Sequence, residues 1–267
     1  MGDSDIDTHA SCGMLSPKAM PASPPSISVI VVSKNPGPRL QIALESLWAQ
    51  TFPAEIIVVD GASTDGTREW LDLHHARIAS LVSESDHGIY DAMNKGIAVA
   101  RGEWVLFLGA DDRLAAPSVL VEVAERLVGT QASIAAGEAR FDNGRAYPFA
   151  GTDTAIRRNF VHHQATFYRR AAFERYGGFD TALRIQADYE FNLRLVDAGE
   201  AFASLNLCIA ECGSGGVSDS GLWANYREEI TVRHRHFSAY SCWPWDVFAL
   251  MRYLRKKIVR RFHIRMP

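Results

Sequence analysis

Acidic residues follow the most apolar segments of this sequence, where a buried strand would reach the surface. Asp111 and Asp112 come just after VLFLG, and Asp60 ends the segment EIIVVD. Two carboxylates about 4 Å apart repel each other by roughly 4 kcal/mol at the effective dielectric of a protein surface, so a nearby cation is expected. A divalent cation suits such oxygen ligands. The alternative is a turn in which each aspartate bonds its own backbone.

Alternating strand and helix patterns position these acids. Four apolar runs without polar alternation predict strands buried on both faces, at 27–32, 55–60, 78–83 and 104–108. Apolar residues at helical spacing predict intervening helices at 40–48, 67–73 and 89–100. This order predicts a mainly parallel, doubly wound α/β sheet, in which ligands bind beyond the carboxyl ends of the strands. Asp60, Asp86 and the acidic pair lie at or just past such ends.

The second half is more mixed. It predicts a helix at 117–128, strands at 133–141 and 201–211, and a helix that starts near Asp188 and ends before Gly199. No linker interrupts the region, so one Rossmann-like catalytic domain is predicted. The domain boundaries are expected to give a disordered tail at 1–26, the catalytic domain at 27–225 and a helical segment at 226–267.

Composition narrows the class of protein. The 267 residues are 47% hydrophobic and carry a net charge of −3, which excludes general disorder and gives no drive toward nucleic acid. We expect a cytoplasmic protein, because no segment has the roughly 18 apolar residues of a membrane span and the N-terminal region has no signal-sequence pattern. Four scattered cysteines predict reduced thiols.

Two classes of nucleotide-binding protein are excluded because the sequence lacks their signature motifs. The first predicted strand is followed by SKNPGPR, which lacks the G-x-G-x-x-G of dinucleotide-binding oxidoreductases. A Walker loop is absent as well, so any phosphate must be held in another way. A divalent cation between acidic side chains is the candidate.

Several motifs between 27 and 218 together resemble family 2 glycosyltransferases, which are inverting enzymes of the type A fold. The order and spacing of the motifs carry the resemblance, and they read SVIVVSKN, IIVVDGASTDGT, SESDHGIYDAMNKGIAVARGEWVLFLGADD, HHQATFY, GGFD and ADYEFNLR. GIYDAMNKG, HQATFY and ADYEFNLR look most like the branch that builds bacterial exopolysaccharide and lipopolysaccharide. Such enzymes move a sugar from a nucleotide diphosphate to an acceptor hydroxyl.

The resemblance gives the acidic pair a role. In this family the acids after the fourth strand bind Mg²⁺ or Mn²⁺ on the donor diphosphate. Here the motif reads Ala110-Asp111-Asp112 and is not a strict D-x-D, so Asp112 is expected to be the direct metal ligand. Asp111 is expected to act through water or the donor ribose.

Other positions match residues that bind the donor in the family. Asp60 corresponds to the aspartate that contacts the nucleobase, with Ser33 and Asn35 on the loop that lines base and ribose. An Asx-turn that closes the strand is the alternative for Asp60. Asp86 and Lys95 flank a helix that faces the donor in relatives, although Lys95 is as readily a solvated helix lysine.

Asp188 corresponds to the family's catalytic base. Ala187 stands where glutamate is usual, and a helix N-cap is the alternative for Asp188. A base here would take the proton of the acceptor hydroxyl. His163 and Gln164 match a segment that borders the active site, where they contact donor sugar or acceptor, or are structural. Residues 214–218, SGGVS, are expected to form a flexible loop over the pocket.

The C-terminal segment joins apolar and basic residues. Trp243, Val247 and Leu254 share a helical face, and seven basic residues but no acidic ones lie between 252 and 267. Residues 243–265 are therefore expected to contact an anionic membrane at the inner face of the cell membrane. Packing on the catalytic domain or a homodimer contact is the alternative.

The sequence thus predicts a metal-dependent inverting glycosyltransferase of bacterial surface polysaccharide synthesis. Its donor is expected to be a nucleotide-sugar, with UDP-sugar first, and its acceptor a saccharide or a lipid-linked saccharide. One alternative is an inactive nucleotide-sugar-binding or scaffold protein, as the missing glutamate before Asp188 would allow. The other is a sugar nucleotidyltransferase, whose phosphate-cradling first loop would have only Lys34 and Arg39 as basic residues.

Overall fold

The computed structural model describes residues 26–213 and 222–263, with side chains up to Val259. The predicted disordered tail lies outside these residues except for Ser26, and the predicted loop at 214–218 lies outside them entirely. Of the helices in these two ranges, none combines the length and the apolar character needed to cross a lipid bilayer.

The first half alternates strands and helices as the sequence predicts. Its four strands are parallel and lie side by side in the order β3-β2-β1-β4, with Ile30 of β1 paired to Ile57 on one side and Phe107 on the other. The elements are β1 (Ile27–Ser33), α1 (Arg39–Trp48), β2 (Glu55–Asp60), α2 (Thr67–Leu73), β3 (Ser80–Ser83), α3 (Ile89–Val99) and β4 (Trp104–Gly109). The residues of β1, β2 and β4 are almost completely buried, as their apolar runs require, whereas those of β3 are partly exposed.

The second half adds an antiparallel strand that the sequence analysis missed. β8 (Thr166–Arg169) lies between β4 and β6 and runs antiparallel to both. The sheet is therefore mixed, in the order β3-β2-β1-β4-β8-β6-β9-β5, with β7 beside β6. The remaining elements are β5 (Arg113–Leu114), α4 (Val119–Leu127), β6 (Ile134–Phe141), β7 (Ala146–Tyr147), α5 (Arg170–Tyr176), α6 (Ala187–Asp197) and β9 (Phe202–Cys212).

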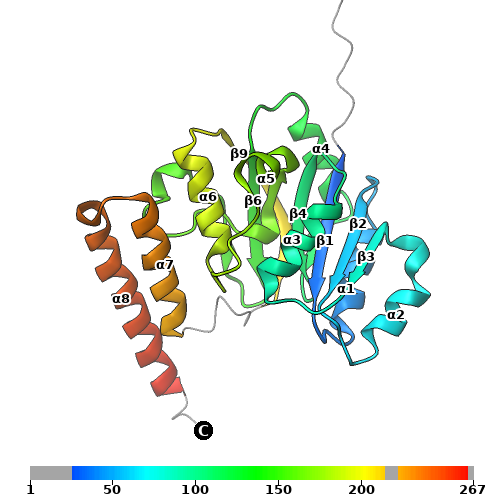
Figure 1. Ribbon diagram of the computed structural model, residues 1–267, viewed down its shortest axis with the longest axis horizontal. Coiled ribbons are helices and arrows are strands. Elements are labelled where there is room, and N and C mark those ends of the chain that lie inside the picture. The colour runs from blue at the N-terminus through cyan, green and yellow to red at the C-terminus, as the bar shows by residue number, and fades with distance from the viewer. Residues whose placement is uncertain (1–25, 214–221, 264–267) are drawn as a thin grey trace, which may run out of the picture.

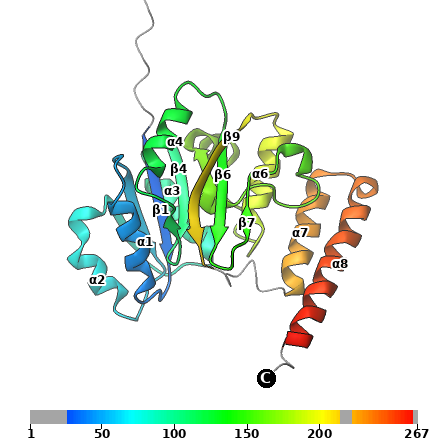
Figure 2. The ribbon, with the colours of Figure 1, turned by 180° about the vertical axis from the view of Figure 1, so that it is seen from behind.

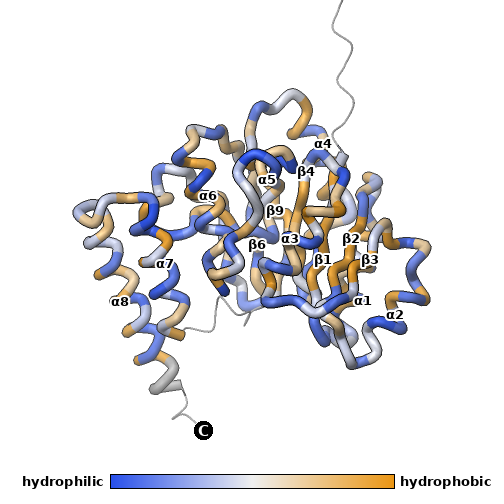
Figure 3. The backbone as a smooth tube through the Cα atoms, viewed as in Figure 1, coloured by the Kyte–Doolittle hydropathy of each residue, from blue (hydrophilic) through white to orange (hydrophobic). Residues whose placement is uncertain are grey.

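Helices cover both faces of the sheet. α1, α2 and α4 pack on one face, where Leu44 and Leu120 meet Val31 of β1 in one buried cluster (Figure 2). α3, α5 and α6 cover the other face, where Met93 and Phe191 join Phe107 (Figure 1). The central strands are the most apolar part of the chain (Figure 3), and the carboxyl ends of the parallel strands β1, β2 and β4 reach one edge of the sheet.

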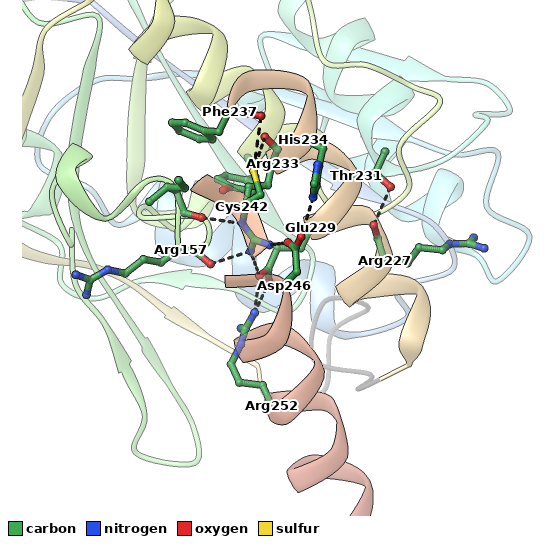
Figure 4. Close-up of polar contacts among 12 residues, drawn as sticks. Arg157, Arg227, Glu229, Thr231, Arg233, His234, Phe237, Cys242, Asp246 and Arg252 are labelled. Carbon is green, nitrogen blue, oxygen red and sulfur yellow. Dashed lines mark hydrogen bonds and ion pairs between the residues drawn. The ribbon is translucent and has the colours of Figure 1, made fainter. Parts of the chain in front are cut away.

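A helical hairpin completes the chain beside α6. α7 (Trp223–His236) and α8 (Ala239–His263) are joined by a short turn, and α8 projects past the carboxyl edge of the sheet (Figure 1). Buried Arg233 holds the hairpin: its guanidinium donates to Glu229 at 2.7 Å and Asp246 at 2.5 Å. It also donates to the carbonyl oxygens of Ile156 and Arg157, which anchors α7 to the segment between β7 and β8 (Figure 4).

Removal of this guanidinium should destabilise the protein. Arg233→Ala leaves Glu229 without one of its two arginine partners and Asp246 without its shortest contact, so we expect a loss of about 3–5 kcal/mol. Urea unfolding measures the loss. Arg227→Ala, an exposed arginine on the same helix, should change stability by less than about 0.5 kcal/mol. Equal stability of the two variants would contradict the anchoring role.

Candidate active site

A large pocket opens at the carboxyl edge of the sheet. Its volume is about 860 Å³, near the upper end of the usual range for ligand pockets. Its walls come from the end of β1, the start of α3, the loop after β4, the segment before β8, the start of α6, and the α7–α8 hairpin. Among the predicted site residues, the lining includes Ser33, Asp111, His163, Gln164 and Asp188.

The acidic pair follows β4, but its two carboxylates face different surroundings. The Asp111 side chain lines the pocket and is 44% exposed, with Arg39 Nη1 at 4.0 Å. Asp112 is 2% exposed and accepts hydrogen bonds from the backbone of Gly109 at 2.7 Å and from Gln164 Nε2 at 3.0 Å. Burial raises the pKa of the Asp112 carboxyl, and the charge of Asp111 adds to this shift.

A short turn before β8 connects the acidic pair to Asp188. In this 3-10 turn, His163–Ala165, the adjacent side chains of Gln164 and His163 contact the two acidic centres, Asp112 and Asp188. Gln164 binds Asp112, while His163 Nδ1 lies 3.4 Å from Asp188 Oδ2. Asp112 and Asp188 are thus linked through neighbouring residues of one turn, whereas Asp60 and Asp86 do not line the pocket.

The Asp188 carboxylate is buried and fully hydrogen-bonded. Oδ1 accepts from the Tyr90 hydroxyl and from the Tyr189 backbone, both at 2.9 Å, and Oδ2 accepts from Asn159 Nδ2 at 2.9 Å. Burial alone would raise the pKa of Asp188, but the hydrogen bond and charge of His163, together with Tyr90, outweigh it and lower the pKa. The carboxylate is therefore ionised at neutral pH.

The start of α6 supports this ionisation. Asp188 lies in the first turn of the helix, whose positive end favours a negative charge. The N-cap residue is Gln186, so Asp188 is not the cap that the alternative interpretation required. Burial also raises the pKa of the Tyr90 phenol, which keeps this group protonated as a donor to Asp188.

Asp60 lies at the end of β2, beneath the loop that follows it. It is fully buried and accepts hydrogen bonds from the backbone and hydroxyl of Ser63 and from Ser83 Oγ at 2.8 Å. Ser33 is its neighbour in the parallel pairing and lines the pocket. The Ser33 Oγ atom is buried without a hydrogen-bond partner among the described residues, so it is placed to meet a ligand.

Other predicted residues support the loops or lie outside the pocket lining. Asn35 has φ +48° and accepts a bond from the Thr64 backbone, which ties the first two loops together. Asp86 packs against Gly61, where an added Cβ would lie 2.1 Å from Asp86 Oδ2. Lys95 Nζ lies 3.0 Å from Glu84 Oε1, so this lysine forms a local ion pair and does not line the pocket.

Two site residues escaped the sequence analysis as individual positions. Tyr90 lies within the quoted motif GIYDAMNKG, which was its available signal, but no role was assigned to it. Asn159 belongs to no motif, and only the fold brings it to Asp188. A neighbouring residue, His162, has a neutral ring, because burial lowers its pKa to about 3. This ring stacks on that of His163, with 5.3 Å between the ring centroids.

The acidic pair fits a divalent cation. Mg²⁺ is commonly held by one or two carboxylates together with the phosphates of a substrate. Burial and the charge of Asp111 raise the pKa of the Asp112 carboxyl, and a nearby positive charge would favour its ionised form. Gln164 Oε1 adds a buried oxygen that has no hydrogen-bond partner among the described residues. These three residues could hold such an ion.

Comparison with known proteins now identifies the family. The profile of glycosyl transferase family 2 matches residues 28–183, which is more than half of the chain. The chain therefore belongs to glycosyl transferase family 2. The resemblance seen in the sequence is confirmed at the level of the family.

Curated relatives agree with this assignment. A PGL/p-HBAD biosynthesis glycosyltransferase of Mycobacterium bovis is 34% identical over 177 residues, covering 64% of this chain and 69% of the relative. The glycosyltransferase AglE of Haloferax volcanii is 27% identical over 202 residues, covering 67% of this chain and 64% of the relative.

Solved structures confirm the type A fold. Staphylococcus aureus TarS 1–349 in complex with UDP-GlcNAc has a TM-score of 0.64 at 20% identity, covering 78% of this chain and 64% of that one. The mannosyltransferase PcManGT of Pyrobaculum calidifontis, in complex with GDP-Man and Mn²⁺, has a TM-score of 0.60 at 21% identity, covering 88% and 77%. This chain spans 39% of a longer TarS structure.

The pKa of Asp188 should respond to His163. His163→Ala removes the leading contribution that lowers this pKa, so burial should prevail and raise it. Titration of the aspartate carboxyl carbons by ¹³C NMR measures the change. His75→Ala, on the exposed turn at His75–Arg77, is the control and should leave the pKa unchanged. An unaltered Asp188 pKa in His163→Ala would show that the contact does not control this charge.

Proposed function

We propose that this protein is an inverting glycosyltransferase that transfers a sugar from a nucleotide diphosphate to a hydroxyl of a saccharide or lipid-linked saccharide. One observation carries the proposal: Asp111 and Asp188 line the same pocket, and the turn at His163 and Gln164 contacts both acidic centres. The family and its glycosyltransferase relatives support it. We further propose a role in bacterial surface polysaccharide synthesis.

The donor is proposed to occupy the end of the pocket formed by β1 and β4. Ser33 offers its hydroxyl to the nucleoside, while Asp60 and Asn35 hold the loops that border it. Asp111 and Asp112 would hold Mg²⁺ or Mn²⁺, which neutralises charge on the departing diphosphate when bound. UDP-sugars are the first donors to test, because the structural neighbour TarS is solved with UDP-GlcNAc.

Asp188 is proposed as the base of the reaction. Its carboxylate would accept the proton of the acceptor hydroxyl as that oxygen attacks the anomeric carbon, opposite the diphosphate. The bonds from Tyr90 and Asn159 fix its orientation. His163 also lines the pocket and would position the carboxylate from the side of the acidic pair.

A nucleotide-sugar-binding protein without turnover is the second candidate. The lowered pKa of Asp188 favours it, because a carboxylate with several donors is a weaker base than an unpaired one. Ala187, fully buried where glutamate is usual in the family, points the same way. Release of the free nucleoside diphosphate from the donor by the wild-type protein would exclude this candidate.

Replacement of Asp188 tests the proposal. Asp188→Asn keeps the side-chain shape but removes the base, so transfer should fall about 10²- to 10⁴-fold while donor binding persists. Sugar transfer and donor calorimetry in the presence of Mn²⁺ measure the two effects. Asp197→Asn, on the far end of the same helix, should retain full activity. Normal turnover by Asp188→Asn would remove the proposed base.

The hairpin gives the protein a proposed place at a membrane. Trp243, Val247, Leu254 and Ile258 form an exposed apolar stripe along α8, each between 46% and 59% exposed. Arg255 and Lys257 are exposed basic residues on the same helix. We propose that this stripe lies on an anionic membrane surface, at the inner face of the cell membrane, where a lipid-linked acceptor would be found.

Vesicle binding tests the stripe. Leu254→Glu should abolish co-sedimentation with vesicles containing phosphatidylglycerol, because it places a charge within the apolar contact. Leu73→Glu, at an exposed leucine on α2, is the control and should bind as the wild type does. If Leu254→Glu instead converts a dimer to a monomer without loss of vesicle binding, the stripe is a homodimer contact and the membrane proposal is wrong.

A further inference from the structure

One hydrogen bond to Asp188 comes from an irregular segment of the chain. Asn159 Nδ2 donates to Asp188 Oδ2 at 2.9 Å, and Asn159 lines the same pocket as Asp188. Asn159 lies between the turns Thr152–Thr154 and His163–Ala165, outside any helix or strand. The position of its side chain therefore depends on contacts other than the backbone pairing of a helix or a sheet.

Helix α6 holds this segment at two places. The Tyr189 hydroxyl donates to the carbonyl oxygen of Ala155 at 2.6 Å, and Asn192 Nδ2 donates to Asn159 Oδ1 at 3.1 Å. Asn192 follows Asp188 by four residues, so the two side chains lie on one face of the helix. The helix that carries Asp188 thus also positions a residue that donates to Asp188.

Asn192 is a costly residue for the place that it occupies. It lies in the middle of α6 between Phe191 and Leu193, and all three side chains are fully buried. Asparagine is a poor helix former, and burial of an amide is unfavourable unless the amide is hydrogen-bonded. An apolar side chain would serve packing alone at this position. The hydrogen bond to Asn159 gives Asn192 a polar role instead.

The donors and acceptors of these three side chains allow one consistent arrangement. An ionised carboxylate can only accept hydrogen bonds, so Asn159 turns its Nδ2 toward Asp188. Its Oδ1 then faces Asn192, which presents its own Nδ2. If the Asn159 amide were reversed, its oxygen would face the carboxylate and repel it. The amide of Asn192 thus determines which end of Asn159 meets Asp188.

We propose that Asn192 is a positioning residue of the active site, which acts through Asn159 to hold the Asp188 carboxylate in the orientation that the reaction needs. This inference rests on the proposed function, because it takes Asp188 as the base. Asn192 is fully buried and does not line the pocket, so a substrate in the pocket would not touch it. Tyr90 donates to Oδ1 of Asp188, whereas the two asparagines together act on Oδ2.

Titration of the Asp188 carboxyl carbon by ¹³C NMR, without donor, acceptor or divalent metal, tests the inference. Asn192→Leu removes the amide that orients Asn159, so the pKa of Asp188 should rise. Asn159→Leu should raise the same pKa, because it removes the donor itself. Thermal unfolding checks that the variants fold, and Asn192→Ala, which adds no volume, serves if leucine is not accommodated. An unchanged Asp188 pKa on loss of the Asn192 amide would overturn the inference.

Other titratable side chains also interact with the Asp188 carboxylate. They come from α3, β7, β8 and the segment before β8, and all of them are unchanged in these variants: Tyr90, Tyr147, Tyr168, His162 and His163. A rise in the Asp188 pKa is therefore assigned to the two asparagines.

A double variant distinguishes an effect through Asn159 from a general loss of packing. If Asn192 acts only through Asn159, Asn192→Leu should cause no further rise of the Asp188 pKa in a protein that already carries Asn159→Leu. A full additional rise would reject the proposed route. Leu195→Ala, a buried change on the same helix, is the control, which should lower stability but leave the Asp188 pKa unchanged. An equal rise in this control would also reject it.

Turnover gives a second measurement. With Mn²⁺ and a UDP-sugar, Asn192→Leu should lower kcat roughly tenfold while KM for the donor stays within about twofold, because the base is misaligned and donor contacts remain. The acidic limb of the pH profile should move to higher pH, since a base with a raised pKa ionises later. A change confined to donor KM would contradict a positioning role.

The two measurements separate this inference from the proposed function. The titrations need no turnover, so an unchanged Asp188 pKa in both Asn192 variants would overturn the role of Asn192 and leave Asp188 as the proposed base. Absence of transfer by the wild-type protein would instead remove the proposed function, whatever the titrations show.

Discussion

The site depends on the burial of two acidic centres against one short turn. Asp112 and Asp188 are both almost inaccessible to solvent, and an unpaired buried carboxylate would be costly. Gln164 provides a polar partner for Asp112, and the adjacent His163 provides one for Asp188. Because these two side chains follow each other in the chain, their contacts fix how far apart the acids can lie. The geometry of the pocket follows from this constraint.

The mixed sheet explains why the turn lies there. β8 begins directly after the turn and pairs antiparallel with β4, with Phe167 opposite Leu106, so the turn before β8 lies toward the carboxyl end of β4. The acidic pair follows β4, which brings the turn and the pair to the same edge of the sheet. The helical hairpin then closes the opposite side of the pocket, where buried Arg233 anchors it. The proposed donor and acceptor ends thus have separate structural supports.

The sequence was sufficient for the parallel half of the fold. Long apolar runs identify β1, β2 and β4, and the motifs identify the family. It was not sufficient for β8, whose four residues resemble any short buried segment. Nor could it show which of Asp111 and Asp112 faces the pocket, because that depends on the turn that Gly109 and Gln164 stabilise. The contact of Asn159 with Asp188 likewise arises only from the tertiary fold.

The location of a bound metal ion tests the account most directly. Crystals grown with Mn²⁺ and either UDP or GDP would show the ion as an anomalous scattering peak. We expect the peak within coordination distance of the Asp111 or Asp112 carboxylate, with the nucleoside near Ser33 and the diphosphate directed toward Asp188. A nucleotide bound outside this pocket, or a manganese ion remote from both aspartates, would contradict the proposed site.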